Sequence, residues 1–416
     1  MTASSHRSTD VLIIGAGPAG LSAAASLAPH RPGQVLVLER ERTAGGIPRH
    51  SDHLGYGIRD MCRFMSGPAY ARRLTQQAQT AGADIQTEAM VTDWVDDHRV
   101  EVTSPRGRTT IEAAVIILAT GARERPRPAR MVPGDRPAGV YTTGQLQNLV
   151  HLEHRAPGTR AVIVGAELVS WSAVMTLRQA HCETALMTSL YSRPEAYAAF
   201  TVPGRLALRV PVATRTRVTQ IIGRGRVSAV EIADLDTHHR RIVPCDTVVF
   251  TGDWIPDHEL ARSAGLEMHR GTRGPVVDSR QATSRRGVFA IGNLTHPVDT
   301  ADVASLDGRA VARHVLSYLE RDGHDQDERG TRIEPGSGLK WITPSLLVPG
   351  VEPARSRLLA WPHRPILLPT VTIRGSGTTV ARRRLPWPAS PGRVFRIPTA
   401  ILPTATGRGT ITIDVE

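Results

Sequence analysis

The stretch VLIIGAGPAGLSAAASL, residues 11–27, decides the fold. An apolar run that suits a buried strand ends at a glycine, and an alanine-rich run that suits a helix follows it. Three glycines in GxGxxG spacing stand at this junction, where they allow a tight bend, the close approach of a pyrophosphate and close contact of helix with sheet. We therefore predict a dinucleotide-binding turn made by Gly15, Gly17, Pro18, Ala19 and Gly20.

An acidic residue follows the next predicted strand. The run Gln34–Leu38 is apolar, and Glu39 comes nineteen residues after Gly20. A carboxylate at the end of that strand can accept hydrogen bonds from ribose hydroxyls, so the strand context and the acid strengthen the glycine motif. The same predicted cofactor site includes Arg40, Gly46 and Val91.

The pattern of strands and helices changes three times along the chain. A second strand-turn-helix pattern begins at Ala161, and the first resumes at GVFAIGN, residues 287–293, before an amphipathic helix predicted from about Thr300 to Leu319. We predict an α/β fold with two Rossmann-like dinucleotide-binding domains, the second inserted in the first, and a small C-terminal all-β domain. The predicted ranges are 1–125 and 265–325 for the first domain, 126–264 for the inserted domain and 326–416 for the β-rich basic domain.

Two further motifs accompany the first fingerprint. They are VIILATGARERP and, later, GVFAIGNLTHP. With them the chain resembles the two-dinucleotide-binding-domain flavoproteins, the pyridine nucleotide-disulfide oxidoreductase-like group, in which three such motifs hold FAD. The resemblance implies FAD as cofactor of the first domain, which is then the FAD-binding domain, and makes the inserted domain NAD(P)-binding-like. It adds Ala119, Thr120, Gly121, Gly292 and Asn293 to the predicted site. Asn293 stands where the group has aspartate, which keeps hydrogen bonding but removes a negative charge beside the pyrophosphate.

Longer segments are similar to a narrower set of proteins. GGIPRHSDHLGYGIRDMCRFMSGPAYARRL and HPVDTADVASLDGRAVA resemble segments of hydrogen cyanide synthase and opine oxidase flavoprotein subunits. This similarity implies oxidation of a small amine or amino acid, or electron transfer for a partner that performs it. Those proteins commonly carry a cysteine-rich C-terminal region for an iron-sulfur cluster, which the tail of this chain cannot supply.

The stretch after Gly46 supplies catalytic candidates. In the layout of the resembled group it lies near the isoalloxazine, where His53 could take a proton from an amine and Arg49 or Arg59 could bind a carboxylate. His296, just after the third motif, is a further candidate. The alternative is that these side chains line a solvated loop or satisfy buried backbone groups. We predict no metal site, because the HxxH spacing of His50 and His53 lacks a nearby third ligand.

The second fingerprint, RAVIVGAELVSWSA at residues 160–173, departs from the pattern. Glu167 replaces its second glycine and Ser170 its third. A carboxylate facing a pyrophosphate would repel it by about 3 kcal/mol at ~5 Å and an effective dielectric of ~20. NAD(P)H is therefore a doubtful ligand, although a Glu167 that points away would still allow it to bind.

Composition excludes several classes. The three cysteines, Cys62, Cys182 and Cys245, form no CxxC or CxxxxC pair, which excludes disulfide reduction. The net charge is +12, and residues 329–416 hold thirteen Arg or Lys against four Asp or Glu. This tail is either a solvated basic face or a docking face for an acidic protein partner, and no nucleic-acid-binding signature accompanies it. The apolar run at residues 11–28 contains Gly and Pro, so we expect no membrane span, no signal sequence and a cytoplasmic protein.

Three functions remain open. The leading hypothesis is a FAD-dependent oxidoreductase acting on CH-NH or CH-NH2 donors of a small amine or amino acid, which passes electrons to a partner protein or to oxygen. The second is an NAD(P)H-dependent reductase of an iron-sulfur or other carrier. The third is a structural FAD-binding subunit of a larger complex. The bound flavin would supply the redox chemistry in the first two.

Overall fold

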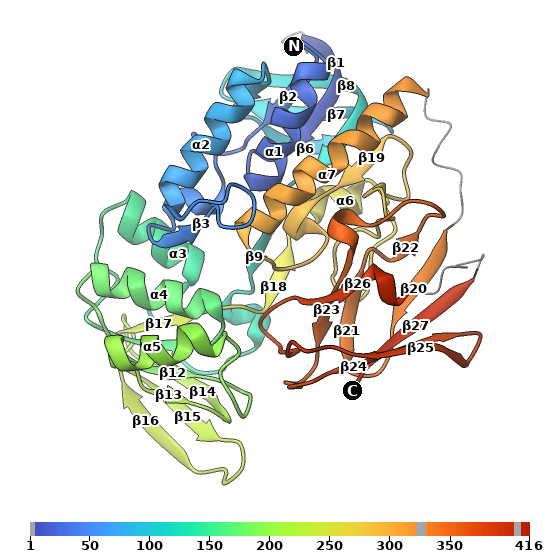
Figure 1. The fold of residues 1–416 in the computed structure, drawn as a ribbon. Helices are drawn as coiled ribbons and strands as arrows, with labels where there is room; N and C mark the ends of the chain where they lie inside the picture. Colours follow the sequence, from blue (N-terminus) through green and yellow to red (C-terminus); the bar gives the residue numbers. More distant parts are fainter. Residues whose placement is uncertain (1–4, 322–329, 403–408) are drawn as a thin grey trace.

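The computed structural model describes residues 5–321, 330–402 and 409–416. Within them lie two α/β units and a β-rich C-terminal part (Figure 1). The predicted fold class is confirmed, because the second unit interrupts the first and both contain a parallel sheet flanked by helices. The boundaries near residues 125, 264 and 325 stay predictions.

The first unit is built on a sheet in the order β5-β2-β1-β8-β7-β6, with β19 pairing β8. Strands β5, β2, β1, β8 and β19 run parallel, whereas β7 pairs β8 and β6 pairs β7 antiparallel. The apolar run 11–14 is buried on both faces, as a parallel sheet covered on two sides requires. The strands are β1 (Ser5–Ile14), β2 (Val35–Leu38), β5 (Asp84–Gln86), β6 (Met90–Trp94), β7 (Arg99–Ser104), β8 (Gly107–Leu118) and β19 (Val288–Ala290).

Three helices cover one face of this sheet, α1 (Pro18–Leu27), α2 (Gly67–Thr80) and α7 (Ala301–Glu320) (Figure 1). A Cβ added at Gly308 of α7 would lie 2.1 Å from the carbonyl oxygen of Ala19, so α7 and α1 touch backbone to backbone. This contact brings a segment from residue 300 onward against the turn at residues 15–20. The short α6 (Glu259–Ser263) packs on the other face beside β6.

The second unit has a parallel sheet in the order β10-β17-β11-β12-β13. Alternating residues of β11 face two cores: Ile163 packs with the helices, and Val162 packs with an antiparallel sheet β14-β15-β16. A two-stranded antiparallel link, β9 with β18, joins this unit to the first. The elements are β9 (Ala122–Glu124), β10 (Val140–Thr142), α3 (Thr143–Gln147), β11 (Arg160–Val164), α4 (Leu168–Gln179), β12 (Glu183–Thr188), α5 (Ala198–Leu208), β13 (Val212–Ala213), β14 (Thr216–Ile222), β15 (Ala229–Asp234), β16 (Arg240–Pro244), β17 (Thr247–Phe250) and β18 (Trp254–Pro256).

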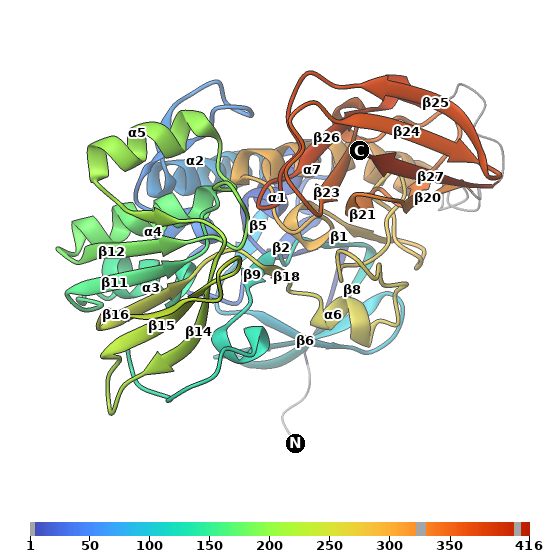
Figure 2. The ribbon, with the colours of Figure 1, turned by 90° about the horizontal axis from the view of Figure 1, so that it is seen from below.

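The C-terminal part consists of two packed sheets, β22-β20-β27-β24-β25 and β21-β23-β26. Its core includes Ile342, Leu358 and Ile413, which are fully buried. It lies against both α/β units, beside α7 and near the chain between β12 and α5 (Figure 2). The strands are β20 (Thr331–Pro335), β21 (Leu339–Thr343), β22 (Leu346–Leu347), β23 (Arg357–Pro362), β24 (Thr370–Gly375), β25 (Thr378–Arg384), β26 (Phe395–Pro398) and β27 (Thr410–Val415).

Short elements complete the described chain. A small hairpin, β3 (Leu54–Tyr56) with β4 (Met65–Ser66), precedes α2. Short 3-10 helices are η1 (Ala28–His30), η2 (Ile47–His50), η3 (Arg127–Arg130), η5 (Gly292–Leu294), η7 (Ala354–Ser356) and η8 (Thr399–Ile401). A π-helical turn, η4 (Asn148–Leu152), follows α3. Among the described residues, none of the helices combines the length and the apolar composition that crossing a membrane requires.

Candidate functional site

The glycines of the first fingerprint differ in how tightly they are packed. A Cβ at Gly15 would lie 2.5 Å from the carbonyl oxygen of Ala119, and one at Gly20 would lie 1.9 Å from the carbonyl oxygen of Gly15. Gly15 also has φ of +108°, a backbone conformation that favours glycine. In contrast, apart from its own chain neighbours, no atom of the described residues lies within 4 Å of a Cβ built on Gly17. The turn is therefore close-packed at both ends and open in the middle.

The open position lies in front of a helix N-terminus. Gly17 is the N-cap of α1 and Pro18 follows it, and no side chain of the described residues caps this end. The first N–H groups of an uncapped helix, together with its macrodipole, make a favourable place for an anion. The space before Gly17 therefore fits a pyrophosphate.

Glu39 lies at the edge of the same space and is oriented by the backbone. Its Oε2 accepts a hydrogen bond from the N–H of Ala16 at 2.9 Å, and its Oε1 accepts one from the N–H of Glu41 at 3.0 Å. Each carboxylate oxygen can accept a further bond, so the pair is held ready for ribose hydroxyls. Next to it, Arg40 forms an ion pair with Asp257 at 3.0 Å, while Val91 is buried in the core below the sheet.

The other two motifs meet this turn. The N–H of Ala119 donates to the carbonyl of Ile14 at 2.9 Å. Thr120 Oγ1 donates to the carbonyl of Asp257 at 2.7 Å, and the Asp257 N–H donates to Gly121 at 2.9 Å. A Cβ at Gly292 would lie 2.8 Å from Ala19.

The loop after β2 packs on the same turn. The N–H of Gly45 donates to the carbonyl of Ala16 at 2.8 Å, and a Cβ at Gly46 would lie 2.9 Å from the Cα of Gly17. The structure thus brings three separate motifs and this loop around one uncapped helix end. This cradle of close-packed backbone fits FAD.

Asn293 performs a local task. Its Nδ2 donates to the carbonyl of Asp299 at 3.1 Å, and its Oδ1 accepts the N–H of Asp299 at 3.0 Å. The side chain therefore closes the loop that precedes α7. From the sequence, this amide was expected to contact the cofactor. The spacing of the motif gives no sign that the backbone of Asp299, six residues later, is its partner.

His53 is held as a neutral imidazole. Its Nδ1 lies 2.8 Å from the carbonyl of Leu54, which assigns the proton to Nδ1, and its Nε2 lies 3.0 Å from the hydroxyl of Ser51. Burial lowers the pKa of His53 below 6.5, so the ring is neutral at pH 7. Gln147 of α3 donates to Ser51 at 3.2 Å and to Ser172 of α4 at 2.7 Å, which links this loop to the second unit.

Arg59 is already paired. Its guanidinium lies 3.3 Å from the carboxylate of Asp302, and its backbone N–H donates to the same group at 3.0 Å. Asp302 is 2 % exposed and lies in the first turn of α7, so a negative charge stands at that helix N-terminus. Arg49 is also paired, with Glu41.

His296 belongs to a buried ionic cluster. Its Nε2 lies 2.5 Å from Asp307 of α7, and Arg355 of the C-terminal part lies 2.8 Å from the other oxygen of Asp307. Burial alone would raise the pKa of Asp307, but Arg355 and His296 hold it below its ordinary value. Sequence reasoning missed Asp302 and Asp307. Their one signal is the presence of acids among the apolar positions of a helix that packs on a core.

At the second fingerprint, the side chain of Glu167 is hydrogen-bonded to residues beside the turn itself. Its Oε2 accepts hydrogen bonds from the hydroxyls of Ser170 at 2.9 Å and Thr251 at 2.8 Å. Ser170 thus replaces a glycine with a residue that holds the carboxylate. The alternative in which Glu167 points away does not occur in this structure.

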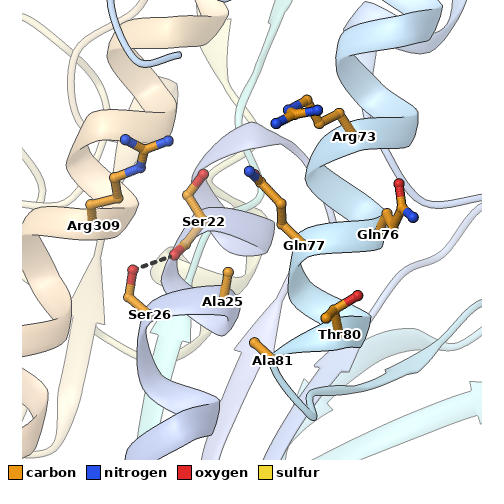
Figure 3. A pocket seen from close by; sticks show the side chains of 9 residues that line it. All are labelled: Ser22, Ala25, Ser26, Arg73, Gln76, Gln77, Thr80, Ala81 and Arg309. Atoms are coloured by element: carbon orange, nitrogen blue, oxygen red, sulfur yellow. Dashed lines mark hydrogen bonds between the residues drawn. The ribbon is translucent and has the colours of Figure 1, made fainter.

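A surface groove of about 570 Å³ lies elsewhere, between α1, α2 and α7 (Figure 3). Arg73 and Arg309 stand on opposite sides of it (Figure 3). The predicted cofactor residues do not line it, so it is separate from the cradle. The groups of His, Cys, Asp and Glu in the described ranges include no cluster of three that could hold a metal ion.

Comparisons with known proteins agree with the geometry. The family model for pyridine nucleotide-disulphide oxidoreductases matches residues 9–308. The chain is 28% identical over 363 residues to the benzene 1,2-dioxygenase system ferredoxin–NAD(+) reductase subunit of Pseudomonas putida, with 78% of this chain and 82% of that protein covered. It is 28% identical over 377 residues to an opine oxidase subunit of Rhizobium meliloti (strain 1021), with 79% and 76% covered.

The fold is shared with solved structures. Thioredoxin reductase from T. acidophilum matches with a TM-score of 0.64 at 23% identity, covering 76% of this chain and 99% of that one. The expected family resemblance is confirmed by these findings. The chain therefore belongs to the pyridine nucleotide-disulphide oxidoreductase family.

Proposed function

We propose that this chain is the FAD-dependent reductase component of an electron-transfer system, in which it passes electrons between its flavin and a protein carrier of the iron-sulfur class. FAD is the cofactor of the family, and when bound it exchanges two electrons with a donor and single electrons with a carrier. The proposal places this chain closer to the second of the three functions considered from the sequence than to the first.

The observation that carries the proposal is a flavin cradle without a dithiol. The described residues contain Cys62, Cys182 and Cys245 as free thiols. Cys182 and Cys245 lie in separate hydrophobic clusters, and burial raises their pKa to about 12 and about 11. Burial makes these two thiols unreactive, and the exposed Cys62 is a single thiol, so the described residues offer no dithiol pair that could take electrons from the flavin. A protein carrier is the route that suits a reductase of this family.

The names of two relatives support the same class. One is the ferredoxin–NAD(+) reductase component of a dioxygenase system, and the other is one of the subunits of opine oxidase. Both names describe components of larger assemblies. We infer that this chain also works with at least one protein partner.

Amine or amino-acid oxidation is the second candidate. The neutral His53, whose Nε2 faces Ser51, could accept a proton from a substrate amine. Against it, both arginines that could bind a substrate carboxylate are already paired with acids of this chain, Arg59 with Asp302 and Arg49 with Glu41. Releasing Arg59 would leave the buried carboxylate of Asp302 without its cationic partner. The pairing therefore favours the reductase.

The test is direct electron exchange. The FAD-loaded protein is reduced by light under anaerobic conditions and mixed with an oxidised [2Fe-2S] ferredoxin. We expect the flavin absorption band to return as the iron-sulfur band bleaches, within seconds. A flavin that stays reduced with iron-sulfur proteins but is bleached by amino acids in the dark would contradict the proposal and favour amine oxidation.

A further inference from the structure

The two strand-to-helix turns of this chain differ in what lies in front of the helix N-terminus. In the first, the space in front of Gly17 is open and α1 has no side-chain cap among the described residues. In the second, Glu167 stands at the position equivalent to Gly17, as the N-cap of α4. The same backbone pattern therefore presents an open helix end in one unit and a carboxylate in the other.

The carboxylate of Glu167 fills the turn. A Cβ at Gly165 would lie 2.5 Å from its Oε2, and a Cβ at Gly252, after β17, would lie 2.2 Å from its Oε1. The group is thus wedged between the ends of two neighbouring strands, β11 and β17, and is fixed there by Ser170 and Thr251. This is the edge at which a parallel sheet of this kind binds a dinucleotide.

A second acidic side chain, Glu195, lies at the adjoining strand end. In a dinucleotide fold the residue after the second strand faces a ribose. Here that residue is Ser189, directly after β12, and it is 2 % exposed. Its hydroxyl donates to Oε2 of Glu195 at 2.9 Å. The hydroxyl is therefore engaged within the chain.

The C-terminal part covers both acidic side chains. A Cβ added at Gly392 would lie 2.6 Å from the Cβ of Glu195 and 2.7 Å from the Cγ of Glu167. The guanidinium of the next residue, Arg393, lies 4.0 Å above the ring of Tyr197, a cation–π distance that holds the segment in place. The family model ends at residue 308, so this cover lies outside the part of the chain that defines the family.

We infer that the second dinucleotide site is filled by the protein itself and does not take NADH or NADPH: Glu167 holds the place of the pyrophosphate, Glu195 engages the ribose-facing position, and the segment Pro391–Arg393 covers both. The second unit then serves as a wall against which the C-terminal part packs. This inference goes beyond the proposed function and does not depend on which carrier accepts the electrons.

The experiment is equilibrium binding of NADH and NADPH to the FAD-loaded full chain by titration calorimetry. We expect no saturable binding by the unaltered protein below ~1 mM. The variant E167G/S170G restores the glycine pattern, and we expect measurable affinity in it. Adding R393A, which removes the cation–π contact, should tighten binding at least tenfold more, because the covering segment is then easier to displace.

Matched controls separate the parts of the inference. R382A removes an exposed arginine from β25 of the same domain and should not change the affinity of E167G/S170G. E167Q keeps the volume without the charge and should still exclude the nucleotide. Micromolar binding by the unaltered protein would overturn the inference. So would a folded, FAD-retaining E167G/S170G/R393A protein without affinity. Failure of electron exchange with ferredoxin would overturn the proposed function and leave these binding results unaffected.

Discussion

At Gly17 a side chain could be added without steric conflict, since the position is open and its φ of −82° suits any residue. The equivalent position of the second turn already carries Glu167. Gly17→Glu would therefore copy the second turn into the first. We expect it to weaken FAD binding by ~100-fold, because a carboxylate ~5 Å from the pyrophosphate costs about 3 kcal/mol at an effective dielectric of ~20.

The measurement is the FAD content of the purified protein together with a titration of the apoprotein with FAD. Gly17→Ala is the control, because it adds a side chain without charge and should change the affinity far less. The unfolding temperatures of the apoproteins should be the same for the unaltered chain, Gly17→Glu and Gly17→Ala. Full FAD retention by Gly17→Glu would show that the pyrophosphate does not lie before this residue.

The geometry of single turns could be predicted from the sequence, but the partners of single side chains could not. Spacing alone placed Gly15, Gly17 and Gly20 at one strand-to-helix junction, because the constraint is local. The states of Arg59 and His296 depend on Asp302 and Asp307, and for Arg59 the acid lies more than 240 residues away along the chain. No local pattern specifies such pairs, so the roles of these residues stay predictions.

At the scale of elements, the crossing of α1 and α7 holds the cradle together. Gly308 lies where the two helices touch, and an added methyl group would meet the carbonyl oxygen of Ala19 at 2.1 Å. We expect Gly308→Ala to lower the unfolding free energy by about 1–3 kcal/mol, the usual cost of overpacking, despite the better helix propensity of alanine. Because α7 would move away from the first turn, FAD retention should fall as well.

Thermal unfolding of the apoprotein and FAD content would be measured on the same preparation. Gly144→Ala in α3 is the matched control, since its new Cβ would have an ordinary contact of 3.5 Å with the side chain of Glu124. Unchanged stability of Gly308→Ala would mean that the helices separate easily at this crossing.

Most elements of the α/β units follow from the sequence, and the pairing of the C-terminal strands does not. The helix predicted at residues 300–319 forms at Ala301–Glu320, and the strand predicted at 34–38 forms at Val35–Leu38. Short strands were expected in the tail and are present. However, β20 pairs parallel with β27 almost eighty residues later, and alternation of apolar residues carries no information on such a distant partner.

For the whole molecule, the contact between the second unit and the C-terminal part should depend on pH. Burial and the charge of Glu167 raise the pKa of Glu195 from 4.5 to about 8. The folded protein thus binds a proton that the unfolded chain releases, so stability is full below pH ~4.5 and falls as pH rises toward 8. Between these pH values we expect the free energy of unfolding to fall by an amount on the order of 2–4 kcal/mol because of this pair of acids.

Several charged and titratable groups lie near the pair Glu167 and Glu195, so the test must isolate the titration of Glu195. Glu167 and Tyr191 face Glu195 from the second unit, while Arg130 faces Glu167 and Arg393 stands on the neighbouring Tyr197. Glu195→Gln removes the titration and should make the protein more stable than the unaltered chain at pH 9 but not at pH 5. Unfolding scans across this range, with Glu183→Gln at the exposed start of β12 as control, would measure the difference. Parallel curves for both variants would contradict the assignment.

The link of β9 with β18 is a narrow connection about which two units could in principle turn. The C-terminal part spans it, with Arg355 and Arg396 bound to Asp307 and Asp299 on one side and Gly392 set against Glu167 on the other. Because the C-terminal part contacts the chain on both sides of the link, the link cannot bend without breaking these contacts. These contacts on both sides of the link oppose rotation of the second unit against the first. On the proposed function, we therefore expect one constant distance between the flavin and a docked carrier.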